Sequence, residues 1–199
     1  KFDLLKRAEK AKAEGKIRHI GFSFHDKLES FKEIIDGYDK WEFCQIQYNY
    51  MDIKNQAGTE GLEYASRKGI PVVVMEPILG GRLANPPAEI TGVMNAHPVR
   101  RTPAEWALQW IWSHPEVAVV LSGMSTMEQL DQNLQSADRS EPGLLNGKDM
   151  EMIAKVRAVF AERTLVPCTH CDYCMPCPSG VNIPWAFEIY NNGRIYNDL

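Results

Sequence analysis

The chain has 199 residues, of which 44% are hydrophobic and 24% are charged. This composition is typical of a globular protein with a substantial core and one main domain, and it argues against disorder. The formal net charge is -4, and the lysines and arginines are scattered along the sequence. Because no basic cluster stands out, we predict neither nucleic acid nor a membrane surface as a partner.

The longest apolar runs, GIPVVVM and VAVVL, are too short to cross a bilayer, and the first residues contain no signal-peptide hydrophobic region. We therefore expect a cytoplasmic protein.

Residues 2–11 place apolar side chains at helical spacing, and Gly15 is a good helix end. This helix has no capped start, and the far end shows no closing element. We therefore expect a fragment of a larger protein.

Short β-rich runs then alternate with helical patterns. The expected strands are residues 17–23, 42–48, 71–77 and 117–123. Each is followed by an expected helix, at residues 28–38, 58–69, 102–114 and 125–134. This strand-then-helix order predicts parallel strands joined by right-handed crossovers.

Two α/β architectures fit this alternation, an open doubly wound sheet and a consecutive part of a closed (β/α)8 TIM barrel. The sequence favours the barrel, because no strand leads into a G-x-G-x-x-G turn. Polar residues also stand at the expected carboxyl ends of the strands, namely Ser23, Gln45, Gln47, Glu76 and Ser122. About four βα units cannot close a barrel, so we expect a missing half to complete it.

Residues 80–100 lack periodicity and are rich in Gly, Pro and Asn. We expect a long loop on the carboxyl side of the strands, which is either a substrate lid or a plain surface insertion. Residues 147–162 form one more amphipathic pattern, and a cysteine-rich segment follows. We accordingly divide the chain into a partial barrel, residues 1–146, and a C-terminal helix with a cysteine module, residues 147–199.

Four of the five cysteines fall within ten residues, in the spacing C-x2-C-x2-C-x2-C. This cluster is unlike a secreted disulfide framework and predicts a metal site. It is close to the ferredoxin run C-x2-C-x2-C-x3-C-P, although the last interval is one residue shorter. A structural zinc site prefers two separated pairs, so an iron-sulfur cluster is favoured over zinc, and a redox dithiol is the third alternative. The predicted ligands are Cys168, Cys171, Cys174 and Cys177.

The other cysteine, Cys44, lies in an expected strand between Phe43 and Gln45, with Ile46 close by, and is predicted to be a buried small hydrophobe. No histidine comes with a partner pattern that marks a general base. We expect ordinary structural or surface roles for His19, His25, His97, His114 and His170.

Five segments in order resemble the aldo-keto reductases, specifically the branch with a ferredoxin-like 4Fe-4S module after the barrel. They are GKIRHIGFSFH, FCQIQYNYMD, GIPVVVMEPILGG, TPAEWALQWIWSHPEVAVVLSGMSTMEQLDQNL and CTHCDYCMPCPSGVNIP. The resemblance implies the C-terminal half of the (β/α)8 barrel, with a small ferredoxin-like cysteine-rich extension. It also implies an oxidoreductase that uses NADP or NAD to reduce a small carbonyl substrate.

The resemblance implies a role for several residues at the strand ends. Ser23 and Gln45 would hold the nicotinamide carboxamide, and Met75 stands where relatives place an aromatic ring. Independently, period-2 alternation puts Phe43, Gln45 and Gln47 on one face of their strand. The pyrophosphate would lie near Glu76, Ile78 and Gly80. The adenine end would meet Ser122, Gly123, Met124, Ser125, Gln129, Gln132 and Asn133.

Two further expectations concern what the chain lacks. Gly123 and Gln129 stand where many relatives have a cation, which leaves NAD and NADP open. The family's catalytic Asp, Tyr, Lys and His belong to the first half of the barrel, so we assign no catalytic residue and expect this chain alone to be inactive.

The resemblance also implies how the cysteines would be used. Cys168, Cys171 and Cys174 would share one cluster, and Cys177 would reach toward a second cluster, whose other ligands follow further on in the branch. Electron transfer to a partner is compatible with this arrangement. The alternative from another class of protein is a zinc-stabilised, barrel-derived binding or scaffold protein without redox activity.

Overall fold

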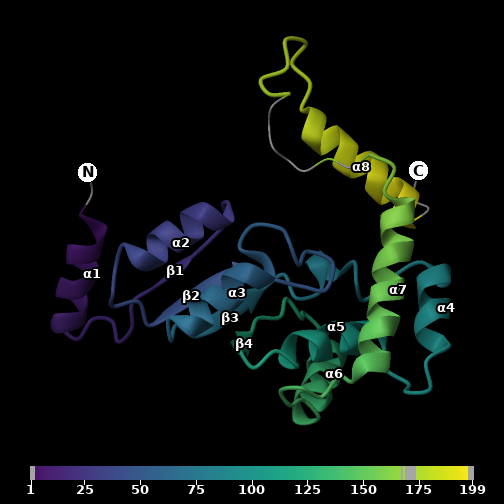
Figure 1. Ribbon diagram of the computed structural model, residues 1–199, viewed down its shortest axis with the longest axis horizontal. Coiled ribbons are helices and arrows are strands. Elements are labelled where there is room, and N and C mark those ends of the chain that lie inside the picture. The colour runs from purple at the N-terminus through teal and green to yellow at the C-terminus, as the bar shows by residue number, and fades with distance from the viewer. Residues whose placement is uncertain (1–2, 167, 169–173, 197–199) are drawn as a thin grey trace. The chain divides into compact units, whose positions relative to one another are not determined.

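A computed structural model describes residues 3–166, 168 and 174–196. The chain forms two compact units, the first from residues 1–83 and 104–145 and the second from residues 84–103 and 146–199 (Figure 1). Residues 84–103 thus join the C-terminal segment rather than the sheet. The functional division that we placed after residue 146 stays a prediction.

The first unit is built on a parallel sheet. Within the described residues the sheet has four strands in the order β1-β2-β3-β4. The strands are β1 (Gly21–Ser23), β2 (Phe43–Gln47), β3 (Val72–Met75) and β4 (Val117–Val120). The helices of this unit are α1 (Leu4–Ala13), α2 (Leu28–Asp36), α3 (Gly58–Arg67), α5 (Pro103–Trp112) and α6 (Met127–Asp138). The predicted alternation and the parallel pairing are confirmed, and the fold is α/β.

The core of this unit explains the side-chain pattern of β2. Cys44 and Ile46 are buried, with 0% and 1% of their surface exposed, whereas the alternate positions remain partly accessible. Phe31 of α2 is also fully buried, and its ring centroid lies 5.8 Å from that of Phe22 and 5.0 Å from that of Phe24. One face of the sheet is therefore a hydrophobic core, and Cys44 is the small buried residue that its surroundings predicted.

The strands end earlier than their sequence patterns predict. β3 stops at Met75 and β4 stops at Val120, so Glu76 and Ser122 lie in the loops that follow. At Glu76 the backbone turns to a positive φ of 55°, which is incompatible with a continued strand. Glu76 and Ser122 are consequently loop residues that follow the strand ends, whereas Ser23, Gln45 and Gln47 lie within their strands.

The second unit contains α4 (Ala88–Asn95), α7 (Gly147–Arg163) and α8 (Ile183–Tyr196). The prediction of a plain loop over residues 80–100 is wrong, because this stretch contains α4, which lies alongside α7 (Figure 1). A short 3-10 turn, η1 (Leu79–Gly81), also overlaps its start. Ile90 and Met94, one turn apart, are buried in α4 and anchor it. Ile90, Val93 and Met94 stand at helical spacing, but the segment is short, contains an interior glycine and is flanked by Gly and Pro, which favoured a loop.

α7 confirms the amphipathic helix expected at residues 147–162. It starts with a capping box in which Asn146 and Asp149 bond reciprocally, and it buries one face through Met152, Ile153, Val156 and Phe160. Within the described residues, no helix combines the length and the apolar character needed to span a membrane.

The described C-terminal residues contain α8, a helix that the sequence analysis did not predict. The Asn191 side chain donates to the Val166 carbonyl at 2.8 Å and accepts from the Val166 N–H at 3.0 Å. Arg163 of α7 also donates to the Ile195 carbonyl at 2.6 Å. Because α8 is held by these polar contacts, its position is not marked in the sequence by a periodic apolar stripe. Large apolar side chains of α8, such as Trp185, instead remain exposed.

Candidate functional site

Three neighbouring strands bring Ser23, Gln45 and Met75 together at their carboxyl ends. Ser23 and Gln45 are register partners in β1 and β2, and the Gln45 amide nitrogen lies 3.4 Å from Ser23 Oγ and 3.4 Å from Met75 Sδ. The contact with Ser23 Oγ is longer than the usual N–H···O range, and a thioether sulfur is a weak acceptor, so both contacts are weak. The Gln45 amide can therefore exchange these two contacts for a stronger hydrogen-bond partner with little loss of protein stability.

A second polar group forms at the end of β2 around Gln47, and sequence reasoning missed its other members, Asn49, Asp52 and Gln56. The Gln47 amide donates to Asp52 Oδ2 at 2.7 Å and accepts from the Gln56 amide at 3.2 Å. Asn49 is completely buried and accepts from the main-chain N–H groups of Met51 and Asp52, both at 3.0 Å. The signal that could have revealed this group is an Asn just after a strand, which favours an Asx turn.

The loop after β3 contains the residues predicted to lie near a pyrophosphate, and its backbone is unusual. Positive φ values occur at Glu76 (55°), Leu79 (50°), Gly80 (62°) and Gly81 (92°). A Cβ added at Gly81 would meet nothing within 4 Å. Turns that combine left- and right-handed residues direct main-chain N–H groups into a concave surface that suits an anion. The predicted Glu76, Ile78 and Gly80 all belong to this one short loop.

The loop after β4 and the start of α6 gather most of the residues predicted for the adenine end. Asn133 donates to Ser122 Oγ at 3.0 Å and lies 3.3 Å from Met124 Sδ. The Gln129 amide oxygen accepts from the Ser125 N–H at 2.9 Å.

Thr126 caps the helix by accepting from the Gln129 N–H at 3.2 Å. Gly123 faces open space, since an added Cβ would meet nothing within 4 Å. Gln132 is the exception among the predicted residues, because its amide contacts Glu128 along the helix at 3.2 Å. A helix N-terminus favours an anion, but Glu128 in the first turn opposes this preference.

The cysteine segment is only partly described. Cys168, Cys174 and Cys177 are not joined in disulfides, and Cys171 lies outside the described residues. Among the residues that the structure does describe, no group of three or more His, Cys, Asp or Glu side chains is arranged to hold a metal ion. The predicted ligand set stays a prediction. Cys44 is chemically distinct, because burial raises the pKa of its thiol to about 12.

Two of the described histidines, His97 and His114, make contacts within the fold. His97 is 9% exposed, its Nδ1 accepts from the Val99 N–H at 3.2 Å, and its Nε2 lies 3.5 Å from Asp149 Oδ1. His114 Nδ1 lies 2.8 Å from the Trp110 carbonyl. These contacts suit the structural roles that we expected. His170 lies outside the described residues.

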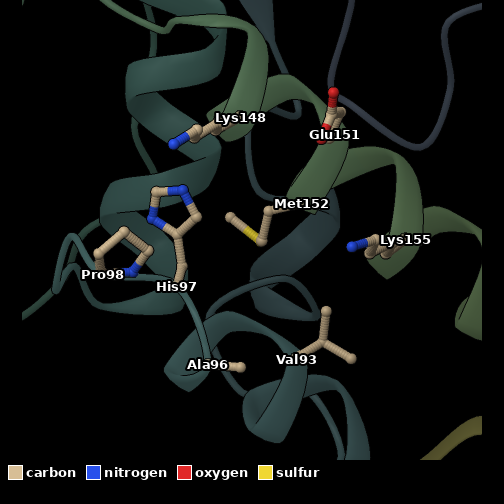
Figure 2. A pocket seen from close by; sticks show the side chains of 8 residues that line it. All are labelled: Val93, Ala96, His97, Pro98, Lys148, Glu151, Met152 and Lys155. Carbon is tan, nitrogen blue, oxygen red and sulfur yellow. The ribbon is translucent and has the colours of Figure 1, made fainter.

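A pocket of about 480 Å³ lies between α4 and α7 in the second unit. Figure 2 shows Met152 in its middle, with the amino groups of Lys148 and Lys155 on either side and Val93 and Ala96 below. The pocket contains none of the residues predicted to bind a cofactor or metal.

A parallel α/β sheet with polar residues collected at the carboxyl ends of successive strands defines a class of protein that binds its ligands at that edge. Residues 2–157, most of the chain, match the Aldo/keto reductase family. The chain belongs to the aldo/keto reductase family, and its parallel α/β sheet is consistent with the family's βα-barrel.

Known relatives agree with this assignment. The uncharacterized oxidoreductase C215.11c of Schizosaccharomyces pombe is 29% identical over 126 residues, which are 63% of this chain and 39% of that protein. The holo form of aldo-keto reductase AKR11C1 from Bacillus halodurans is 26% identical, with a TM-score of 0.58 over 74% of this chain and 53% of that one.

An aldo/keto reductase from Klebsiella pneumoniae in complex with NADP and acetate is 25% identical, with a TM-score of 0.57 over 75% of this chain and 51% of that one. This chain thus spans about half of each solved relative, or less than half in the case of the Schizosaccharomyces pombe protein.

Proposed function

We propose that the chain is the C-terminal half of an NAD(P)H-dependent oxidoreductase of the aldo-keto reductase type, acting on a small carbonyl substrate. The single observation that supports this most is the meeting of Ser23, Gln45 and Met75 at the ends of three adjacent strands. A carboxamide needs one donor and one acceptor held on rigid elements, and Ser23 with Gln45 offers both. The bound cofactor would supply the hydride that reduces the carbonyl.

The rest of the cofactor would extend across the two following loops. The glycine loop at Glu76, Ile78 and Gly80 offers main-chain groups to the pyrophosphate, and residues 122–133 would meet the adenine end, with Gln132 at the margin of that group. The NADP bound by the Klebsiella pneumoniae relative favours NADP over NAD here. We assign no catalytic residue in this chain, and we expect the chain alone to leave carbonyl substrates unchanged.

Titration of NADPH and NADH, separately, against the full-length protein tests this function. Binding of either cofactor in the micromolar range or tighter, with protection of the strand-end loops from hydrogen exchange, is the expected result. Binding of neither cofactor would rule out the reductase assignment. Turnover by the 199-residue chain alone would show that the catalytic groups lie within it.

We further propose that the cysteine segment, a ferredoxin-like extension of the barrel, binds a 4Fe-4S cluster through Cys168, Cys171 and Cys174. Cys177 would serve a second cluster whose other ligands would lie outside these 199 residues. The chemistry of the donors supports this, because closely spaced thiolates outside disulfides are the usual ligands of such clusters. A bound cluster would supply one-electron transfer, with a redox partner as donor or acceptor.

Anaerobic purification distinguishes this from the zinc alternative. Brown protein with about four iron and four sulfide per cluster is expected, and colourless protein with stoichiometric zinc would refute the cluster. The variant Cys174→Ser should lose iron. The matched control Cys44→Ala, at a buried thiol in β2, should retain it.

A further inference from the structure

Asn49, just beyond the end of β2, makes four side-chain contacts while being completely buried. Its amide oxygen accepts from the N–H groups of Met51 and Asp52, both at 3.0 Å. Its amide nitrogen donates to the Glu76 carbonyl at 3.1 Å and lies 3.3 Å from Asp52 Oδ2. An asparagine amide has two acceptor and two donor positions, so this side chain is saturated within the protein. It has no capacity left to touch a ligand.

The contact with Glu76 falls on the most constrained residue of the neighbouring loop. Glu76 adopts a φ of 55°, a left-handed conformation that non-glycine residues hold only where their surroundings enforce it. Its carbonyl accepts a second bond, from the Leu79 N–H at 3.1 Å. One residue earlier, the Met75 carbonyl accepts from the Tyr48 N–H at 3.2 Å. The segment after β2 thus holds two consecutive carbonyls at the end of β3.

We propose that Asn49 is a positioning residue for the cofactor. By holding Glu76 in its left-handed conformation, it sets the direction in which the chain leaves β3 and enters the glycine loop at Gly80. This inference rests on the proposed function, which assigns that loop to the pyrophosphate. Asn49 acts through the loop backbone, without contact to the cofactor.

The substitution Asn49→Asp removes the donor and keeps the acceptor. A carboxylate at position 49 would still accept from the Asp52 N–H. Its other oxygen, however, would lie against the Glu76 carbonyl and the Asp52 carboxylate, and these oxygens would repel one another. In the full-length protein we expect NADPH and NADH to bind about 10-fold more weakly, the loss that follows from one buried hydrogen bond to a constrained loop. The control Asn55→Asp makes the same chemical change at an exposed position of the same segment. It should change the dissociation constants by less than about twofold.

A double-mutant cycle separates positioning from general stability. Glycine adopts the left-handed region freely, so in the Glu76→Gly variant no contact with Asn49 is needed to hold the backbone at position 76 in that conformation. Asn49→Asp should therefore weaken binding about 10-fold in the wild-type background and less than about threefold in the Glu76→Gly background. Equal losses in both backgrounds, or no loss in either, would overturn the proposal. Asn49→Ser, which keeps an acceptor but is too short to reach Glu76, replaces Asn49→Asp if that variant does not fold.

Hydrogen exchange in the cofactor-free protein gives an independent readout. The Leu79 amide, bonded to the Glu76 carbonyl, should exchange faster in Asn49→Asp than in wild type, and its rate should stay unchanged in Asn55→Asp. An unchanged rate in Asn49→Asp would refute the constraint itself. If wild-type protein bound neither cofactor, the proposed function would fall, and exchange at Leu79 would still decide whether Asn49 holds the loop.

Discussion

Gln45→Leu is the substitution that tests the cofactor site most directly. Leucine has a similar volume but neither a donor nor an acceptor. In the protein the Gln45 amide makes two contacts of 3.4 Å, to Ser23 Oγ and Met75 Sδ, and its side chain remains partly accessible. Contacts of that length contribute little. We therefore expect the free energy of unfolding to change by less than about 0.5 kcal/mol.

The effect on cofactor binding should be much larger. A neutral hydrogen bond contributes about 0.5–1.5 kcal/mol, so losing the two bonds between Gln45 and a carboxamide should weaken binding by about 1–3 kcal/mol. That loss corresponds to about a 5- to 150-fold increase in the dissociation constant. The loss should be the same for NADPH and NADH, because the two cofactors share the nicotinamide.

Fluorescence titration of NADPH and NADH against the full-length protein measures this effect, with urea denaturation to verify stability. Gln135→Leu is the matched control, since Gln135 is exposed on α6, away from the strand ends. Unchanged affinity in Gln45→Leu, or a loss equal to that of Gln135→Leu, would refute the assignment of the carboxamide site. A large fall in stability would show that the amide has a structural role.

Three further predictions concern the first unit and the cysteines. Phe31→Ala should lower the free energy of unfolding by about 3–5 kcal/mol in urea, because the ring is fully buried; a loss under about 1 kcal/mol would contradict this packing. At pH 8 iodoacetamide should alkylate Cys174 in cluster-free protein and spare Cys44, whose thiol has a pKa raised to about 12 by burial; mass spectrometry would reveal the opposite. The hydrogen bond from Lys40 lowers the pKa of Glu9 below its ordinary 4.5, so the stability that Glu9 adds is present above pH 4.5 and is lost on acidification. Glu9→Gln should remove that acid-dependent loss, and parallel stability curves for the two proteins between pH 3 and pH 6 would refute it.

The strands and helices of the first unit were predictable because their patterns are local. In β2, Cys44 and Ile46 alternate with Phe43, Gln45 and Gln47, and the side of the strand with Cys44 and Ile46 is buried in the core. α4 and α8 were not predictable in the same way. α4 is anchored by Ile90 and Met94 against a helix that comes more than fifty residues later, and α8 is held by bonds from Asn191 to a distant backbone. The partners of α4 and α8 lie far away in the sequence, so the segments of the two helices do not by themselves reveal these contacts.

The residues of the candidate site also differ in whether the sequence could predict them. Ser23 and Gln45 could be named from the sequence because each ends a recognisable strand, and parallel strands end at one edge. Asn49 could not be named as a constraint on Glu76, because the two residues lie on different loops. Their bond exists only when β2 and β3 are paired in register.

The sequence by itself determined the α/β class, the order of strand and helix, the residues at the strand ends and the spacing of the four cysteines, since these depend on neighbours along the chain. Only the tertiary structure decided that residues 84–103 join the C-terminal helices, that the Gln45 amide reaches Ser23 and Met75, and that the buried Asn49 donates to the carbonyl of Glu76, a residue with positive φ. The physical reason is that these contacts join residues far apart in sequence. Side-chain amides bond according to the positions of their partners in space, which periodicity does not encode.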